Sequence, residues 1–340
     1  FILNLIKNAK HFSVRFSYTD RNRRSIIANL FRIGILFRAY LLLLILPALM
    51  QKVKVEIESG SGFCPGVVNA IKQAEQLLSE SDKLYCLGEL VHNEAELNRL
   101  KRMGMKVIDR SDFKKLSNER VLIRAHGEAP ETYQIARKNN IELVDATCRI
   151  VKNLQKKVKH QSRQIYDSKG QLMIYGKTGH PEVIGLNGNI GGQAIVVEKP
   201  EDIDEVDFSG PVRLFSQTTM DPEGYETIIE LCSKKAMEKG TDFDYQPSVC
   251  RWMTKRVDGL KDFAGRMDMV VFVAGRQSSN GRFLFGKITE VNKNAFKISE
   301  ADELDPKWFV DADRIGVSGA TSTPRWLLEK VAEKIKEMTG

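Results

Sequence analysis

Three cysteines lie far apart in the sequence, and each stands where an apolar, strand-like run gives way to a helical pattern. They are Cys64 in S-G-F-C-P-G-V, Cys148 in D-A-T-C and Cys250 in P-S-V-C. Their separations are too wide for the local ligand clusters of a zinc finger or a ferredoxin. Each separation matches the size of one α/β subdomain, so we expect three subdomains that each contribute one thiolate to a shared centre. Three thiolates leave one iron of a four-iron cluster open to substrate.

The setting of Cys64 favours a thiolate, because Pro65 is a helix-start residue and a thiol at a helix N-terminus has a lowered pKa. Two other cysteines are predicted to be buried structural residues: Cys86, in the apolar run Leu84–Leu87, and Cys232, in a helical pattern. Five cysteines in 340 residues do not make a disulfide framework, and an odd number leaves a thiol unpaired. We therefore expect reduced thiols and a cytoplasmic location.

Three of the five histidines also follow strand-like runs: His92 in L-V-H-N, His126 in R-A-H-G-E and His180 in G-H-P-E-V. Glu182 lies two residues after His180, and Thr218 lies in S-Q-T-T after a further run. A lone histidine is usually a surface or core residue. Three at equivalent positions, close to a carboxylate, indicate a site for anion binding and proton transfer.

Two hydroxyl-rich turns, residues 275–280 and 319–324, each open a helix. Such turns offer backbone N–H groups, side-chain donors and the helix dipole to a phosphate. Helix capping alone would explain either turn. Together with the histidines, the two turns indicate a small diphosphate ligand. The sequence has neither a G-x-x-x-x-G-K-[ST] loop nor a G-x-G-x-x-G fingerprint, which argues against a nucleoside triphosphate or NAD.

From Val53 onward short apolar runs alternate with amphipathic patterns, which predicts α/β units with mainly parallel sheets and ligands at the carboxyl ends of the strands. Subdomains are predicted at 50–147, 148–244 and 245–340, and the first strand is free to pair elsewhere. Strands are predicted at 53–57, 84–87, 121–123, 141–144, 172–175, 194–197, 212–215, 269–273, 295–298 and 314–317. Helices are predicted at 67–78, 94–103, 131–139, 151–166, 222–239, 254–264, 282–292 and 324–336.

The net charge of +8 is concentrated in the first 50 residues, which hold eight Lys and Arg against one Asp. The rest of the chain is nearly neutral and has no basic, aromatic-interleaved stripe, so we expect no nucleic-acid partner. Residues 33–50 are apolar but contain Arg38 and Pro47, which is marginal for a membrane span. We interpret residues 1–49 as a leader or as upstream translation before Met50, and we expect no membrane contact for the catalytic body.

The ordered set G-F-C-x-G-V, V-H-N, A-H-G, D-A-T-C, G-H-P-E-V, Q-T-T, S-S-N and the Ser322 turn resembles the 4-hydroxy-3-methylbut-2-enyl diphosphate reductase (LytB) family. The resemblance covers the chain from about Val53 to its end. It implies a trefoil of three α/β subdomains around one [4Fe–4S] cluster, with Cys64, Cys148 and Cys250 as its ligands. It also implies a diphosphate substrate, and ferredoxin or flavodoxin as the electron donor.

Carried over by motif, the resemblance implies diphosphate binding by six residues: His92, His126, Ser278, Ser279, Asn280 and Ser322. It implies that His180, Glu182 and Thr218 surround the hydroxyl group of the substrate and that Glu182 relays a proton. The implied reaction is reductive dehydroxylation to isopentenyl or dimethylallyl diphosphate.

The chain departs from the family pattern close to its cysteines, at Pro65, Arg149, Trp252 and Met253, and also at Gln277. The large side chains of Trp252 and Met253 stand where the family has alanine and threonine, and are expected to crowd the site. Two alternatives therefore stay open: a zinc hydrolase that uses the same thiols and histidines, and a diphosphate-binding protein without a cluster.

Overall fold

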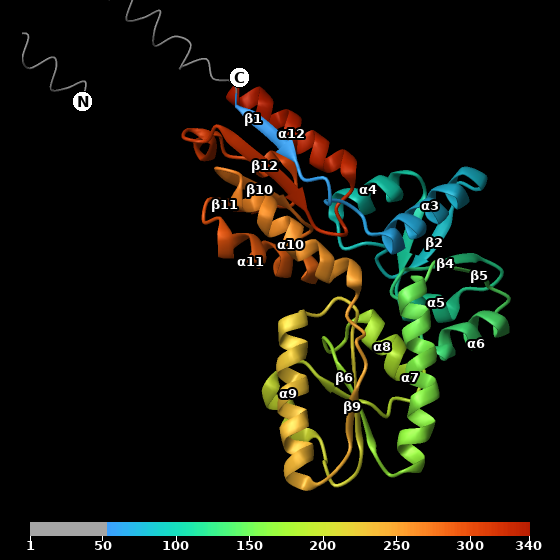
Figure 1. Cartoon of the computed structure of the whole chain (residues 1–340). Helices are drawn as coiled ribbons and strands as arrows, with labels where there is room; N and C mark the ends of the chain where they lie inside the picture. The colour runs from blue at the N-terminus through green and yellow to red at the C-terminus, as the bar shows by residue number, and fades with distance from the viewer. Residues whose placement is uncertain (1–52) are drawn as a thin grey trace, which may run out of the picture. The chain divides into compact units, whose positions relative to one another are not determined.

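The computed structural model describes residues 53–340, and the twelve strands within them form three four-stranded sheets (Figure 1). Every pairing in these sheets is parallel. The predicted class, three α/β units with parallel sheets, is confirmed. The predicted leader, residues 1–49, lies outside the described residues.

All three sheets have the same strand order. The first is β3 (Met105–Ile108), β2 (Leu84–Leu87), β4 (Arg120–Ile123) and β5 (Glu142–Asp145); the second is β7 (Ile195–Val197), β6 (Gln171–Tyr175), β8 (Val212–Ser216) and β9 (Phe243–Tyr245). The third is β11 (Ala295–Ile298), β10 (Met269–Val273), β12 (Arg314–Gly319) and β1 (Lys54–Ile57). The order is second, first, third, fourth in each sheet, if β1 counts as the fourth strand of the third sheet.

The first strand of the described chain completes the sheet formed by its last strands. Lys54 pairs with Arg314 and Ile57 pairs with Val317, and Figure 1 shows the blue β1 beside the red β12. Just beyond β1, Glu58 accepts a hydrogen bond from Arg256 at 3.2 Å, and both side chains are buried. The subdomain limits at 147/148 and 244/245 stay predictions, and β9 spans the second of them.

Helices cover both faces of each sheet. On the first sheet, α3 (Pro65–Glu80) and α4 (Glu94–Arg102) pack on one face, and α5 (Arg110–Lys115) and α6 (Pro130–Lys138) on the other. On the second, α7 (Arg149–Asp167) and α8 (Pro181–Gly188) lie opposite α9 (Pro222–Lys239) and η2 (Pro200–Glu205). On the third, α12 (Arg325–Thr339), η3 (Ala301–Glu303) and η4 (Pro306–Phe309) lie opposite α10 (Arg251–Gly265) and α11 (Ser279–Val291).

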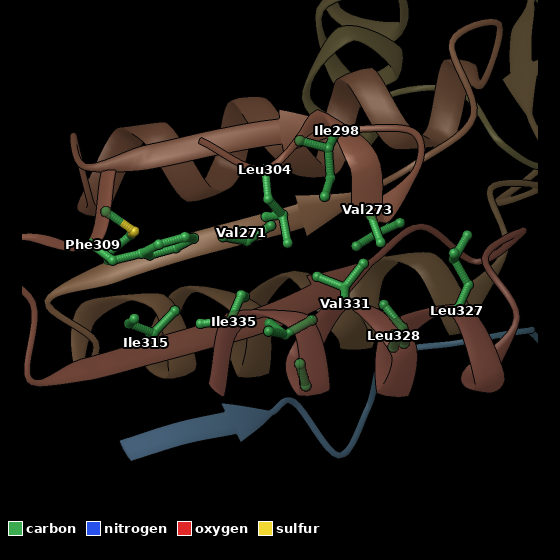
Figure 2. Packing of buried hydrophobic residues seen from close by; sticks show 14 of the residues in the cluster. Val271, Val273, Ile298, Leu304, Phe309, Ile315, Leu327, Leu328, Val331 and Ile335 are labelled. Atoms are coloured by element: carbon green, nitrogen blue, oxygen red, sulfur yellow. The ribbon is translucent and has the colours of Figure 1, made fainter. Parts of the chain in front are cut away.

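The central strands are apolar throughout because both of their faces are covered. Successive side chains of β10 point to opposite faces: Val271 and Val273 contact the layer of α12, whereas Phe272 contacts the layer of α10 and α11. Figure 2 shows Val273 beside Val331 and Leu328 of α12, and Val271 beside Leu304. Full burial of one such side chain stabilises a fold by about 1.5–3 kcal/mol.

Two strands, β3 and β9, and two α-helices, α5 and α8, were not predicted, nor were the short 3-10 helices η2, η3 and η4. β3 and β9 are short edge strands with exposed residues, and α8 contains Gly185 and Gly188, which weaken a helical pattern. The prediction that Cys86 and Cys232 are buried is confirmed, since neither has measurable exposure. Burial raises the pKa of each of these two thiols to about 12.

Candidate functional site

Each of the three separated cysteines follows an edge strand of a different sheet and is the N-cap residue of a helix. Cys64 follows β1 and precedes α3, Cys148 follows β5 and precedes α7, and Cys250 follows β9 and precedes α10. Backbone hydrogen bonds hold all three: their N–H groups donate to Thr321 (3.1 Å), Ala125 (2.9 Å) and Thr218 (2.8 Å), respectively. The equivalent topology of the sheets therefore brings one thiol from each to a common place.

A glycine makes room between two of the thiols. A Cβ on Gly66 would lie 2.8 Å from Sγ of Cys148 and 3.9 Å from Sγ of Cys64, so a side chain here would occupy the space between the sulfur atoms. All three cysteines are partly accessible, are free of disulfides and border one cavity. This donor set, three thiols around a space kept open by glycine, suits a group held by thiolates.

The spacing of the sulfur atoms argues against a single metal ion. Zn–S bonds of about 2.3 Å require the sulfurs around one zinc to lie within about 4.6 Å of one another. Among residues 53–340, the one group of three potential ligands whose atoms all lie within 4.8 Å is His92, His126 and His180. The cysteines do not form such a group. In this arrangement the three sulfur atoms do not surround one metal ion, and the zinc alternative is not favoured.

The prediction of a lowered thiol pKa at Cys64 is wrong for the protein without metal. Backbone N–H groups of Val67 and Gly66 do favour the thiolate, but burial raises the pKa of Cys64, and the charges of Cys148 and Cys250 add to the rise. Burial also raises the pKa of Cys250. At Cys64, desolvation and repulsion from the neighbouring thiolates outweigh the helix N-terminus, so a cationic centre would be needed to favour its thiolate form.

The three histidines gather in one cluster at the carboxyl ends of their sheets. The ring centroids of His92 and His126 are 5.3 Å apart, and those of His126 and His180 are 5.2 Å apart. Burial lowers the pKa of all three, to about 4 for His180 and well below the usual value for His126. The rings are therefore neutral near pH 7, and each can donate one hydrogen bond to a ligand.

The protonation of His180 is fixed by its own helix. His180 is the N-cap residue of α8, and its Nδ1 accepts a hydrogen bond from the backbone N–H of Glu182 at 3.2 Å. The neutral ring must then carry its proton on Nε2. A metal ion would require that nitrogen to be unprotonated, so His180 is built to donate to an oxygen atom and not to bind a metal.

Glu182 is a buried carboxyl group with two hydrogen-bond partners on one residue. Its oxygens accept from the backbone N–H of Thr218 at 2.7 Å and from Oγ1 of Thr218 at 2.9 Å. Burial raises the pKa of Glu182 to about 7, against the opposing effect of the bonds from Thr218. A carboxyl group with this pKa both gains and loses a proton near neutral pH, as a proton relay requires.

The two hydroxyl-rich turns lie side by side, because they follow the neighbouring strands β10 and β12 of the third sheet. Oγ of Ser278, the N-cap of α11, accepts from the backbone N–H of Gly281 at 3.0 Å and lies 3.4 Å from Oγ of Ser322. Oδ1 of Asn280 accepts from both the N–H and the hydroxyl of Thr321, at 2.9 Å each. The turns thereby present hydroxyl groups and helix-terminal N–H groups at one place, as an anion site does.

The structure brings every predicted site residue to one cavity of about 120 Å³. Its lining includes the three cysteines, the three histidines, Glu182, Thr218 and four residues of the hydroxyl-rich turns, namely Ser278, Ser279, Asn280 and Ser322. Gln277 is exposed and does not line it. Their gathering follows from the parallel sheets, because the carboxyl ends of the strands carry all these loops.

Three residues of the site were not predicted from the sequence. Thr219 and Thr321 line the cavity beside predicted neighbours. Arg124 is half-buried with its guanidinium against Gly88, and its charge contributes to lowering the pKa of His126 and His180. Arg124 precedes His126 by two residues. A cation so close to a predicted anion-binding histidine could have identified Arg124 from the sequence.

The departures from the family pattern differ in their placement. Trp252 and Met253 both line the cavity, but Trp252 is 46% exposed, whereas Met253 is buried and its sulfur accepts from Nδ2 of Asn280. Pro65 and Arg149 are exposed beside their cysteines. Crowding of the cavity is therefore chiefly a property of Met253.

No helix within residues 53–340 combines the length and the apolar character that crossing a bilayer would need. This finding concerns the described residues alone.

Comparison with known proteins places the whole described chain in one family. The family model "LytB protein" matches residues 55–336. The 4-hydroxy-3-methylbut-2-enyl diphosphate reductase of Bacteroides thetaiotaomicron is 48% identical over 84% of this chain and 98% of its own length. That of Chlorobaculum tepidum is 40% identical over 83% of this chain and 96% of its own length.

Solved structures agree with these relatives. A structure of (E)-4-hydroxy-3-methyl-but-2-enyl diphosphate reductase, the terminal enzyme of the non-mevalonate pathway, has a TM-score of 0.64 and 34% identity over 84% of this chain and 99% of that one. The enzyme structure from Plasmodium falciparum, with a TM-score of 0.73 and 24% identity, supports the fold over 83% of this chain and 87% of that one. This chain belongs to the LytB family, the family of the 4-hydroxy-3-methylbut-2-enyl diphosphate reductases.

Proposed function

We propose that this protein reduces 4-hydroxy-3-methylbut-2-enyl diphosphate to isopentenyl diphosphate and dimethylallyl diphosphate, the last step of the non-mevalonate route to isoprenoids. Family membership supports the reaction. The observation that carries the proposal is that thiols from three sheets border the same cavity as the histidine cluster and the Glu182–Thr218 pair. The net reaction takes up two electrons and two protons and releases the substrate hydroxyl as water.

Members of this family are iron–sulfur enzymes, and we assign the cofactor here as one [4Fe–4S] cluster with Cys64, Cys148 and Cys250 as its ligands. Their shared cavity and the space that Gly66 leaves between two of the sulfur atoms support this assignment. When bound, the cluster supplies electrons one at a time and an iron that acts as a Lewis acid. The three separate helix N-termini hold the thiols in place before the cluster binds.

Six residues are assigned to the diphosphate: His92, His126, Ser278, Ser279, Asn280 and Ser322. Their neutral rings and hydroxyl groups donate hydrogen bonds, and the half-buried charge of Arg124 adds a favourable potential. The diphosphate is therefore bound mainly by hydrogen bonds from neutral groups that the fold holds in place, and less by positively charged side chains. The fixed Nε2–H of His180 then points a donor at the remainder of the substrate.

Glu182 is assigned the proton relay. With a pKa of about 7 it is partly protonated at neutral pH and can donate to the departing hydroxyl group. Thr218 orients the carboxyl group through two bonds and lines the same cavity. Apart from the hydrogen-bonding residues, the cavity wall includes the apolar side chains of Leu90, Val91 and Val151.

Two further assignments complete the proposal. The electron donor is a small one-electron carrier, a ferredoxin or a flavodoxin. A cytoplasmic location stays a prediction and rests on the five free cysteines.

The proposal is tested by anaerobic reconstitution followed by iron and sulfide analysis and by turnover with reduced methyl viologen. We expect about four irons and four sulfides per chain, an absorption band near 400 nm and oxidation of the dye that depends on the diphosphate substrate. In Cys148→Ser, the iron content and the turnover should both fall. A parent protein that binds the substrate but neither retains iron nor oxidises the dye would overturn the assignment.

A further inference from the structure

A second cavity, a groove of about 820 Å³, adjoins the candidate site and shares all three cysteines with it. Its remaining wall comes mainly from the first turns of α3, α7 and α10. The groove takes no part in the proposed binding of the diphosphate, since the histidines, Glu182 and the hydroxyl-rich turns do not line it. The cysteines, which are partly accessible, are therefore approachable from two cavities.

The groove is basic. Arg149 and Lys156 line it with exposed side chains, and Lys152 contributes a third cation. Its one acidic lining residue, Asp145, is 3.0 Å from Nζ of Lys152 and accepts a hydrogen bond from the backbone of Thr147. The first turns of the three helices contain no acidic residue, and their N-termini add positive potential. The groove thus carries an uncompensated positive charge.

The lining of this basic groove also includes two exposed apolar side chains. Trp252 is 46% exposed and Ile150 is 44% exposed, and both line the groove next to Cys250 and Cys148. An adjoining depression, lined by Lys157 and Arg251 and also by Ile150, extends the basic rim. An exposed tryptophan in the same groove as several cations is a composition typical of protein contacts, in which aromatic residues and arginine are enriched.

We propose that this groove is the docking surface for an acidic protein that carries one electron at a time. The proposal rests on the proposed reductase function. Each encounter oxidises the carrier by one electron and reduces the enzyme by one, and two encounters supply the pair that one substrate consumes. Opposite charges steer such transient partners together and raise the rate of association, while a small contact area lets the oxidised carrier leave.

The test compares charge reversal in the groove with an equal reversal elsewhere. The variant is Arg149→Glu with Lys156→Glu, and its control is Lys234→Glu on α9 with Lys330→Glu on α12, two exposed lysines outside the groove. Each reconstituted enzyme is assayed with an acidic [2Fe–2S] ferredoxin and, separately, with reduced methyl viologen. The dye is a small cation and needs no docking surface. A milder variant, Arg149→Gln with Lys156→Gln, serves if the charge reversal prevents folding.

At low ionic strength, kcat/KM for the ferredoxin should fall about tenfold in the groove variant and remain unchanged in the control. At about 0.5 M salt the kcat/KM values of the groove variant and of the control should converge, because salt screens exposed charges. Methyl viologen turnover and iron content should stay the same in both. Binding of the ferredoxin to the metal-free chains, followed by surface plasmon resonance, should weaken only in the groove variant.

Unchanged ferredoxin kinetics in the groove variant would overturn the proposal. So would an equal loss with the dye, which would mean that Arg149 and Lys156 act on the cluster itself. Loss of binding to a DNA duplex with intact ferredoxin turnover would identify the groove as a nucleic-acid surface instead. If the proposed function fails, the parent protein gives no turnover with methyl viologen, a result distinct from all of these.

Discussion

Replacement of Glu182 by glutamine should remove a proton relay and, at the same time, stabilise the metal-free fold above neutral pH. The pKa of Glu182 is raised from 4.5 to about 7 by burial. For an acid with a raised pKa, the contribution to stability is fully present below about pH 4.5 and is lost as the pH rises through about 7. A difference of this size corresponds to about 3 kcal/mol of destabilisation by the ionised carboxylate at pH above 8.

The assay is urea unfolding of the metal-free wild-type protein and of Glu182→Gln at about pH 5 and about pH 8.5. Histidines and cysteines titrate in both proteins, so the comparison isolates Glu182. Between the two pH values, the free energy of unfolding of the wild type should fall by about 3 kcal/mol more than that of the variant. Glutamine can keep both contacts with Thr218, because Oε1 accepts from its N–H and Nε2 donates to its hydroxyl.

The same variant, reconstituted with iron and sulfide, should keep the parent's iron content and lose about 100-fold or more in turnover. An identical dependence of stability on pH in the two proteins would refute the reasoning, because it would show that the interior does not penalise the charge of Glu182. Full turnover by the variant would refute the assignment of the proton relay. The two results are independent of one another.

Three further changes test the site and its support. Gly66→Ala places a methyl group 2.8 Å from Sγ of Cys148; the free thiol can rotate away, so the melting temperature without metal should change little, while iron retention measured after desalting should fall. Arg256→Met leaves Glu58 buried without its partner and should lower the free energy of unfolding by about 3–5 kcal/mol, measured with urea, whereas adding Glu58→Gln should recover part of the loss. His126→Ala removes one neutral donor and should weaken binding of inorganic diphosphate to the metal-free protein about tenfold by calorimetry; unchanged affinity would remove this residue from the anion site.

The sequence was sufficient to predict the gathering of the site residues because a physical rule links local pattern to distant contact. Apolar runs such as Met269–Val273 identify parallel strands with both faces covered, and loops that follow such strands meet at one edge of a sheet. Cys64 and His180 could therefore be assigned to one cavity, although more than one hundred residues separate them.

What could not be predicted depends on burial that no local pattern records. The helix N-terminus at Cys64 favours a thiolate. The pKa of this thiol is nevertheless raised, because it is buried by residues from other parts of the sequence and lies near two thiols that are distant in sequence. Arg124 looks like a surface cation in sequence, yet it is half-buried beside Gly88. The strand β9 has only three residues, two of them exposed, so its membership of the second sheet follows from its pairing with β8 and not from its composition.

The shared lining of the two cavities explains how the chain accommodates a tryptophan next to a cysteine. Six residues border both cavities: Cys64, Gly66, Cys148, Ile150, Cys250 and Trp252. Gly66 must lack a side chain because the space beside it lies between two sulfur atoms. Trp252 faces no such limit, since nearly half of its surface remains exposed at the groove and need not fit inside the substrate cavity. A bulky residue is therefore tolerated on the side where we expect a partner protein to bind, whereas a single methyl group should not be tolerated between the thiols.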